Sequence, residues 1–151
     1  MRHILALLIL LACTAGALAS SPIRPDPRLT PGVGLPGITV TQIRQSGWAK
    51  RHRDVPEKEK RRVYTEYGIA HHAPRAFEVD HLIPLELGGS NDIRNLWPES
   101  YTGPWNAHIK DKLEDRLHAL VCAGRLSLTV AQHAIATDWI RAFGVYCGGE
   151  R

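Results

Sequence analysis

Cysteine is scarce in this chain of 151 residues, which contains three. None of them forms a C-x-x-C pair, so a structural zinc module built on cysteine is poorly supported. No internal repeat is visible. Charge of one sign is not abundant either, because a net charge of +4 is mild for a protein that coats nucleic acid. The remaining composition, 44% hydrophobic and 23% charged, is that of one ordinary globular domain with a modest core.

The N-terminus has the three parts of an export signal. Arg2 and His3 precede an apolar run at residues 4–12, and Ala17-Leu18-Ala19 offers a small-x-small cleavage site. The run is too short to span a membrane as a permanent helix. We therefore expect a signal peptide at 1–19, a flexible leader rich in proline and glycine at 20–37, a domain at 38–151, and a periplasmic or secreted protein. A lipoprotein site ending at Cys13 is the less favoured alternative.

Export also bears on the other two cysteines. If Cys13 leaves with the signal, the mature chain keeps Cys122 and Cys147 in an oxidising compartment. We expect them to pair, which would stabilise the fold by about 3 kcal/mol in the loop-entropy model.

Positive charge is concentrated in residues 44–62, where eight basic residues face three acidic ones and surround Trp48. Such a segment suits a phosphate backbone, and Lys50, Arg51 and Arg53 are the candidate contacts. A solvated helix face is an equally weighted interpretation, since mixed Lys/Glu runs commonly solvate helices.

The hydrophobic periodicity and the positions of glycine and proline predict an α+β fold. Strands are expected at 38–43, 77–85 and 95–97, with a glycine reversal at 88–89 between the last two. Helices are expected from Pro56 to about residue 67, from about residue 104 to 123, and from 129 to about 144.

The central motif combines Asp80-His81 at the end of an apolar stretch, the double glycine, and Asn95-Leu96-Trp97-Pro98, with a lysine-bearing helix after it. This arrangement resembles the HNH endonuclease family and its ββα-metal fold, including the interval from His81 to Asn95. The segment 107–139 and the "GWAKRHRDV" stretch also resemble small exported bacterial proteins with this signature.

The resemblance implies a role for each residue. His81 would be the general base, Asp80 a metal ligand, and Asn95 would hold the loop and the His81 ring by hydrogen bonds. A second ligand would come from the start of the helix, either His108 or Asn106. Hydrolysis of a phosphodiester requires an activated water and neutralised oxyanion charge, which an imidazole and a divalent metal supply. Mg²⁺ or Mn²⁺ is favoured, with Zn²⁺ as an alternative.

Two features depart from the family pattern. Many members carry a ligating histidine three residues before the lysine, where this chain has Ala107, and the segment between Trp97 and the helix is longer than usual. A geometric objection also arises, because neighbours on a regular strand point to opposite faces. Asp80 and His81 can share a site only if the strand ends, bulges or twists there.

These patterns predict a monomeric, metal-dependent endonuclease with a ββα-metal core and flanking helices, acting on DNA and, as a further expectation, RNA. The alternative is a catalytically inactive HNH-like module that binds nucleic acid or an envelope partner through its basic segment.

Overall fold

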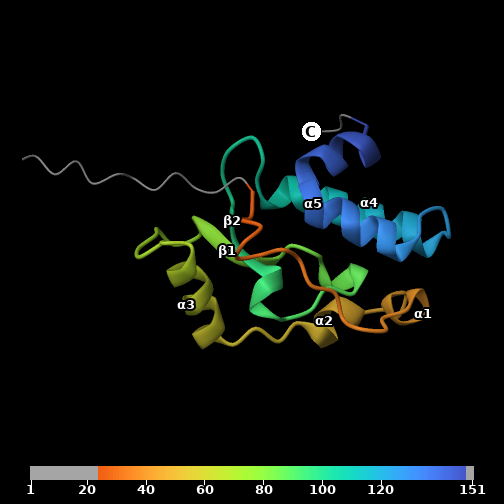
Figure 1. Cartoon of the computed structure of the whole chain (residues 1–151). Coiled ribbons are helices and arrows are strands. Elements are labelled where there is room, and N and C mark those ends of the chain that lie inside the picture. Colours follow the sequence, from red (N-terminus) through yellow and green to blue (C-terminus); the bar gives the residue numbers. More distant parts are fainter. Residues whose placement is uncertain (1–23, 149–151) are drawn as a thin grey trace, which may run out of the picture.

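The computed structural model describes residues 24–148. The predicted signal peptide at 1–19 and Cys13 lie outside this range. Within it the fold is α+β, with five α-helices and one two-stranded antiparallel sheet (Figure 1). The elements follow in the order α1 (Val40–Ile43), α2 (Trp48–His52), α3 (Glu57–Glu66), β1 (Phe77–His81), two short 3₁₀ turns at Leu85–Leu87 and Ile93–Asn95, β2 (Leu96–Ser100), α4 (Ala107–Cys122) and α5 (Leu128–Tyr146).

The hairpin of β1 and β2 has a register that runs from Phe77 opposite Ser100 to His81 opposite Leu96. Strand β1 is shorter than the predicted 77–85, because the backbone N–H of Leu82 bonds to the Asn95 carbonyl and a 3₁₀ turn follows Pro84. Asp80 and His81 are both paired within β1, opposite Trp97 and Leu96, and the strand ends directly after them.

The reversal after β1 depends on its two glycines. Gly88 has a φ of +75°, in the left-handed region that favours glycine. At Gly89 an added Cβ would lie 1.7 Å from the Ile83 carbonyl oxygen, so no side chain fits there. The close approach of these two backbones sets the shape of the loop between the strands.

The described part of the predicted leader, residues 24–37, packs along this hairpin loop instead of lying free. Thr30 is buried and its hydroxyl donates to the Leu96 carbonyl at 2.8 Å. The backbone N–H of Gly32 bonds to the Arg94 carbonyl, and Gly34 forms a bridge with Gly89. These hydrogen bonds therefore hold the described part of the proline- and glycine-rich segment against the hairpin loop.

Helix α1 occupies the stretch for which the sequence predicted a strand, and that prediction was wrong. Thr39 and Gln42 form a capping box, in which the Thr39 hydroxyl accepts from the Gln42 N–H and the Gln42 side chain accepts from the Thr39 N–H. The helix predicted after Pro56 is confirmed as α3, with Pro56 at its N-cap.

Helices α4 and α5 pack as an antiparallel pair beside the hairpin (Figure 1), and both predicted helices are confirmed. Asn106 caps α4 and Ser127 caps α5. Their apolar faces form the main core, which includes Leu113, Leu117, Ile135, Trp139 and Phe143. No helix within residues 24–148 is long and apolar enough to cross a membrane.

The two described cysteines have separate neighbours in this structure. Cys122 Sγ lies 3.3 Å from His118 Nε2, and Cys147 Sγ lies 3.9 Å from the Lys112 carbonyl oxygen. The structure shows no disulfide between Cys122 and Cys147. Their pairing stays a prediction that alkylation before and after reduction tests.

Candidate functional site

A buried lysine organises the face of the hairpin that packs against α4. The side chain of Lys110 is fully buried, and its ammonium donates to Asp80 Oδ2 at 2.6 Å and to the His81 carbonyl at 2.9 Å. It also donates to Glu114, one turn further along α4, and lies 3.9 Å from Glu99 on β2. Lys110 thus joins β1, β2 and α4 at the end of β1.

Acid exceeds base in this cluster. Burial opposes the ionisation of Asp80, but the adjacent Lys110 ammonium outweighs it and holds the Asp80 pKa below its ordinary value. Burial raises the pKa of Glu99 to about 10 and that of Glu114 to about 8, and the negative charge of Asp80 adds to both shifts. With these raised pKa values, the Glu99 and Glu114 carboxyl groups are protonated at neutral pH, which removes the negative charge that no cation neutralises.

The His81 ring is buried, with 1% of the residue exposed, and is held in one tautomer. Asn91 donates through Nδ2 to the His52 carbonyl at 2.8 Å, which directs its Oδ1 toward His81 Nε2 at 2.9 Å. An amide oxygen only accepts, so Nε2 carries the proton and Nδ1 presents a lone pair. Burial lowers the His81 pKa, although the Asn91 bond opposes the shift. The ring is therefore a neutral base at neutral pH.

Asp80 and His81 meet at a cavity of about 50 Å³ at the end of β1. Its polar lining is completed by Arg53, Glu86 and Glu114. Two polar atoms of this lining, His81 Nδ1 and Glu86 Oε1, are buried and have no hydrogen-bond partner among the described residues. The cavity has room for a water or an ion, and these unpaired atoms are available to bind it.

Asn95 holds the loop that shapes this cavity. Its Oδ1 accepts from the Ile83 N–H at 2.9 Å and the Val33 N–H at 3.2 Å, while its Nδ2 donates to the carbonyls of Ile83 and Ser90, both at 2.9 Å. All the hydrogen-bonding groups of the amide are used, so Asn95 has a structural task. The other task predicted for it, holding the His81 ring, belongs to Asn91.

The two predicted helix ligands lie apart from the contacts around Asp80. Asn106 is the N-cap of α4, where its Oδ1 accepts from the Ile109 N–H and its Nδ2 donates to the Gly103 carbonyl at 2.8 Å. The His108 side chain is 71% exposed and lies 4.0 Å from Asp111. Lys110 and Glu114 are the α4 side chains that the structure brings to Asp80.

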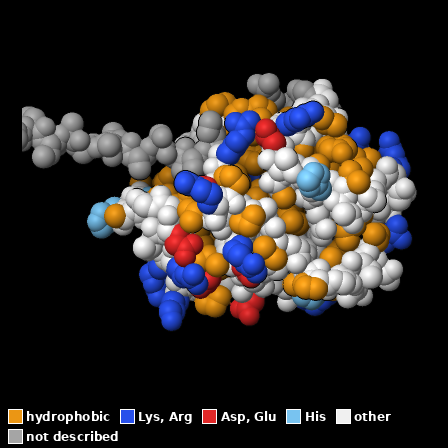
Figure 2. Space-filling model, viewed as in Figure 1, with side chains coloured by type: hydrophobic (Ala, Val, Ile, Leu, Met, Phe, Trp, Pro, Cys, Tyr) orange, Lys and Arg blue, Asp and Glu red, His pale blue; other side chains and the backbone are white. Residues whose placement is uncertain are grey.

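The basic segment divides into two parts. On α3, Arg62 pairs with Glu59 and Glu66, and Figure 2 shows basic and acidic side chains interleaved over the lower left of the molecule, where Figure 1 places α3. Arg51, on α2, donates to the Ser46 carbonyl at 2.6 Å. Lys50 is exposed, as is Arg53, which lies next to the cavity.

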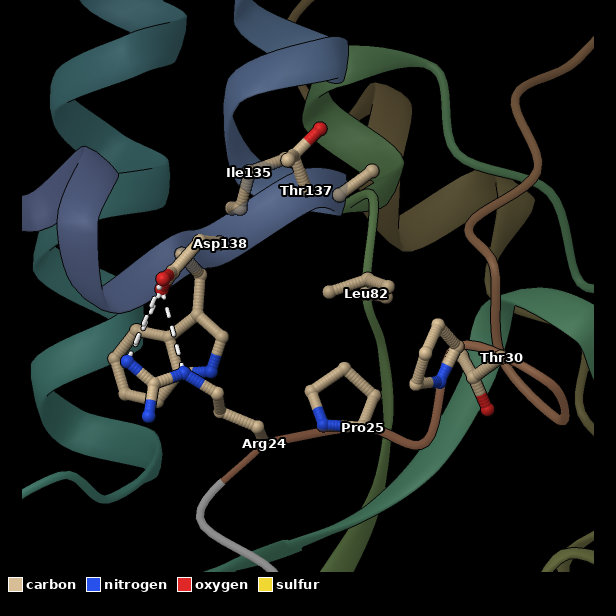
Figure 3. Close-up of a pocket in the computed structure, with 10 residues that line it drawn as sticks. Arg24, Pro25, Thr30, Leu82, Ile135, Thr137 and Asp138 are labelled. Carbon is tan, nitrogen blue, oxygen red and sulfur yellow. Dashed lines mark hydrogen bonds and ion pairs between the residues drawn. The ribbon is translucent and has the colours of Figure 1, made fainter.

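A separate cavity of about 200 Å³ lies between the N-terminal segment and α5 (Figure 3). There Arg24 pairs with Asp138 at 3.4 Å, at the point where α5 has non-helical backbone angles. Asp138 also accepts from the Arg141 N–H at 3.1 Å, as a cap for the second half of the helix. These contacts fasten the N-terminal segment to α5, and we assign this cavity no chemistry.

Sequence reasoning did not place Asn91, Glu86, Glu99, Lys110 or Glu114 at the site. Asn91, Glu86 and Glu99 carried no periodic or spacing signal. A signal did exist for Lys110, because it shares helical spacing with the buried Leu113 and Leu117.

Comparisons with known proteins give no further identification. No family model matches the chain, and no curated protein or solved structure matches it either.

Proposed function

We propose that this protein is a metal-dependent endonuclease of the HNH type that hydrolyses phosphodiester bonds in DNA, with RNA as a further substrate to test. The observation that carries the proposal is the His81 ring, which bonds to Asn91 through Nε2, has a buried Nδ1 without a partner among the described residues, and lines a small cavity beside Asp80. In the same proposal, β1, β2 and α4 form a ββα-metal core.

The chemistry of the base follows from the tautomer in which Nε2 carries the proton. His81 Nδ1 would accept a proton from a water in the cavity while the water oxygen attacks phosphorus and one P–O ester bond breaks. The leaving oxygen takes its proton from solvent. Arg53 lines the cavity and would face the phosphate charge. Asn91 keeps Nε2 protonated and so keeps Nδ1 directed at the water.

The lining suits a hard cation. No three His, Cys, Asp or Glu side chains among residues 24–148 form a ready metal cage. Mg²⁺ usually needs only one or two carboxylates, with waters and substrate phosphate completing its shell. Asp80 and Glu114 would hold it, with Glu86 as a further oxygen donor, and it would neutralise the charge that develops on the phosphate. Mn²⁺ has the same preference for oxygen.

One observation favours a second function. The Lys110 ammonium already pairs with Asp80, so an internal cation neutralises this carboxylate. An inactive HNH-like module that binds nucleic acid through its basic residues would keep this arrangement permanently. The two functions differ in whether a divalent ion binds the cavity.

Plasmid nicking by the mature protein, with EDTA and then with added Mg²⁺ or Mn²⁺, tests the proposal. We expect nicking that EDTA abolishes and added metal restores. Binding of plasmid without nicking under every metal condition would support the inactive module instead.

Calorimetric titration with Mn²⁺ locates the ligands independently of activity. Asp80→Asn and Glu114→Gln should each weaken binding by roughly 10- to 100-fold. His108→Ala, Asn106→Ala and the control Asp111→Asn should leave it within about twofold, because none of these residues lines the cavity. Loss of binding in His108→Ala would return the ligand role to that residue.

A further inference from the structure

We infer that the groove between α3 and β1 binds an unstacked base of single-stranded DNA next to the scissile phosphate. The inference rests on the proposed function for the identity of the substrate. The groove has a volume of about 540 Å³ and is lined by Arg53, Asp54, Val55, Lys60, Tyr64, Phe77, Glu78 and Val79. Its size is that of a pocket for a small molecule or one nucleotide.

The groove and the cavity beside His81 share one lining residue. Arg53 lines both, and β1 passes from Phe77 in the groove to Asp80 and His81 at the cavity. Three residues of a strand span about 10 Å. An unstacked strand extends further per nucleotide than the roughly 3.4 Å of a stacked one, so Phe77 is within reach of a nucleotide beside the reacting phosphate.

Aromatic rings form the wall of the groove. Tyr64 and Phe77 line it, and His72 lies against both, with ring centroids at 4.5 Å from Tyr64 and 5.9 Å from Phe77. Tyr64 and Phe77 are both partly exposed, and His72 is exposed. Such rings stack on bases of any sequence, and each stacked base contributes roughly 1–3 kcal/mol to affinity.

The charges of the groove decide which part of the nucleotide it holds. Asp54 and Glu78 are in the lining with Arg53 and Lys60, and Lys60 already pairs with Glu57, so Arg53 is the basic residue of the lining that is left for a phosphate. The backbone N–H of Arg53 bonds to the Ala49 carbonyl at the end of α2, and its exposed side chain lines both the groove and the cavity. The phosphate therefore belongs at Arg53 and the base at the aromatic wall. A base in a duplex is already stacked, so the preferred substrate is single-stranded.

The test measures binding of short fluorescent oligonucleotides to full-length His81→Ala, which cannot cleave them under the proposed mechanism. Oligothymidine is compared with a fully abasic strand of the same length and charge. We expect the abasic strand to bind roughly 10- to 100-fold more weakly, since it keeps every phosphate but loses the stacking. Equal affinity would overturn the inference and leave a phosphate contact alone.

Two variants with matched controls locate the contact. Tyr64→Leu should remove the preference for bases, while Tyr146→Leu on α5 should keep it. Arg53→Gln should lower the log–log salt slope by about one, while Arg62→Gln, which loses only its ion pairs on α3, should not change it. A base preference that survives in Tyr64→Leu would contradict the inference.

The outcomes separate this inference from the proposed function. If the parent protein binds in a base-dependent way but never nicks plasmid, the base-binding role of the groove stands and the nuclease proposal fails. If the parent protein nicks plasmid but binds the abasic strand as tightly as oligothymidine, the nuclease proposal stands and the base-binding role of the groove fails.

Discussion

Helix α3 and the cluster around Lys110 differ in how their charged side chains are compensated. On α3, Arg62 pairs with Glu59 and Glu66 and Lys60 pairs with Glu57, and the Arg62 side chain is 58% exposed. Around α4, the fully buried Lys110 faces several carboxyl groups and cannot balance them all. Charges on an exposed helix need little compensation, because water screens them. A buried cluster with excess acid costs free energy, and it lies beside His81 Nδ1, which has no hydrogen-bond partner within residues 24–148; the proposed nuclease function would account for both features.

The largest expected effect on stability comes from breaking the buried pair. Asp80→Ala leaves the Lys110 ammonium without the carboxylate partner whose pKa is held low, which should lower the free energy of unfolding by about 3–5 kcal/mol. Urea denaturation at neutral pH measures it. As a control, Asp111→Ala at an exposed position of α4, the helix of Lys110, should change the free energy of unfolding by less than about 0.5 kcal/mol. A loss under 1 kcal/mol for Asp80→Ala would mean that this cluster is as well solvated as α3.

The next effect concerns the orientation of the base. Asn91→Leu removes the acceptor for His81 Nε2–H, so the tautomer is no longer fixed and kcat should fall by roughly 10- to 100-fold with KM nearly unchanged. Asn91→Asp keeps an acceptor at this position and should retain most of the rate. A positioning role would be refuted if Asn91→Asp were as slow as Asn91→Leu.

The contrast between the regions was only partly predictable. The hairpin and α4 follow from alternation, turn residues and helical spacing, and the same spacing places Lys110 with Leu113 and Leu117 on the buried face. His108 is two positions away and therefore faces solvent. The helical period thus argued for Lys110 at the site, while the family resemblance directed attention to His108.

Other features lay beyond sequence reasoning. The contact between Asn91 and His81 depends on how the loop between β1 and β2 folds back toward β1. It also depends on the His52 carbonyl, which belongs to α2. The docking of residues 24–37 depends on carbonyl groups of the hairpin loop, which no side-chain pattern shows. The capping box of Thr39 and Gln42 was a readable signal for α1, but the apolar alternation of that stretch was given more weight.

A smaller, pH-dependent effect tests the excess of acid. The pKa of Glu99 is raised to about 10 by burial, so its folded-state pKa exceeds the unfolded value. Its contribution to stability is therefore complete below about pH 4 and is lost as pH rises through about 10. Glu99→Gln should match the parent in stability at about pH 4 and exceed it at about pH 9, as measured by urea denaturation. An equal loss at both values would show that Glu99 is ionised and pairs with Lys110.

The smallest effect belongs to α3. Arg62→Ala removes two exposed ion pairs and should lower the free energy of unfolding by less than about 1 kcal/mol, with the difference shrinking in high salt. Thermal denaturation at low and high ionic strength measures it. A loss comparable to that of Asp80→Ala would erase the distinction between the two regions.

The central claim is that His81 Nδ1 acts as the base, and the nicking rate of His81→Ala in metal-replete buffer tests it most directly. The account predicts a rate about 10² to 10⁴ times lower than that of the parent, while Mn²⁺ binding persists because Asp80 and Glu114 remain. An unchanged nicking rate in a folded His81→Ala protein would contradict it.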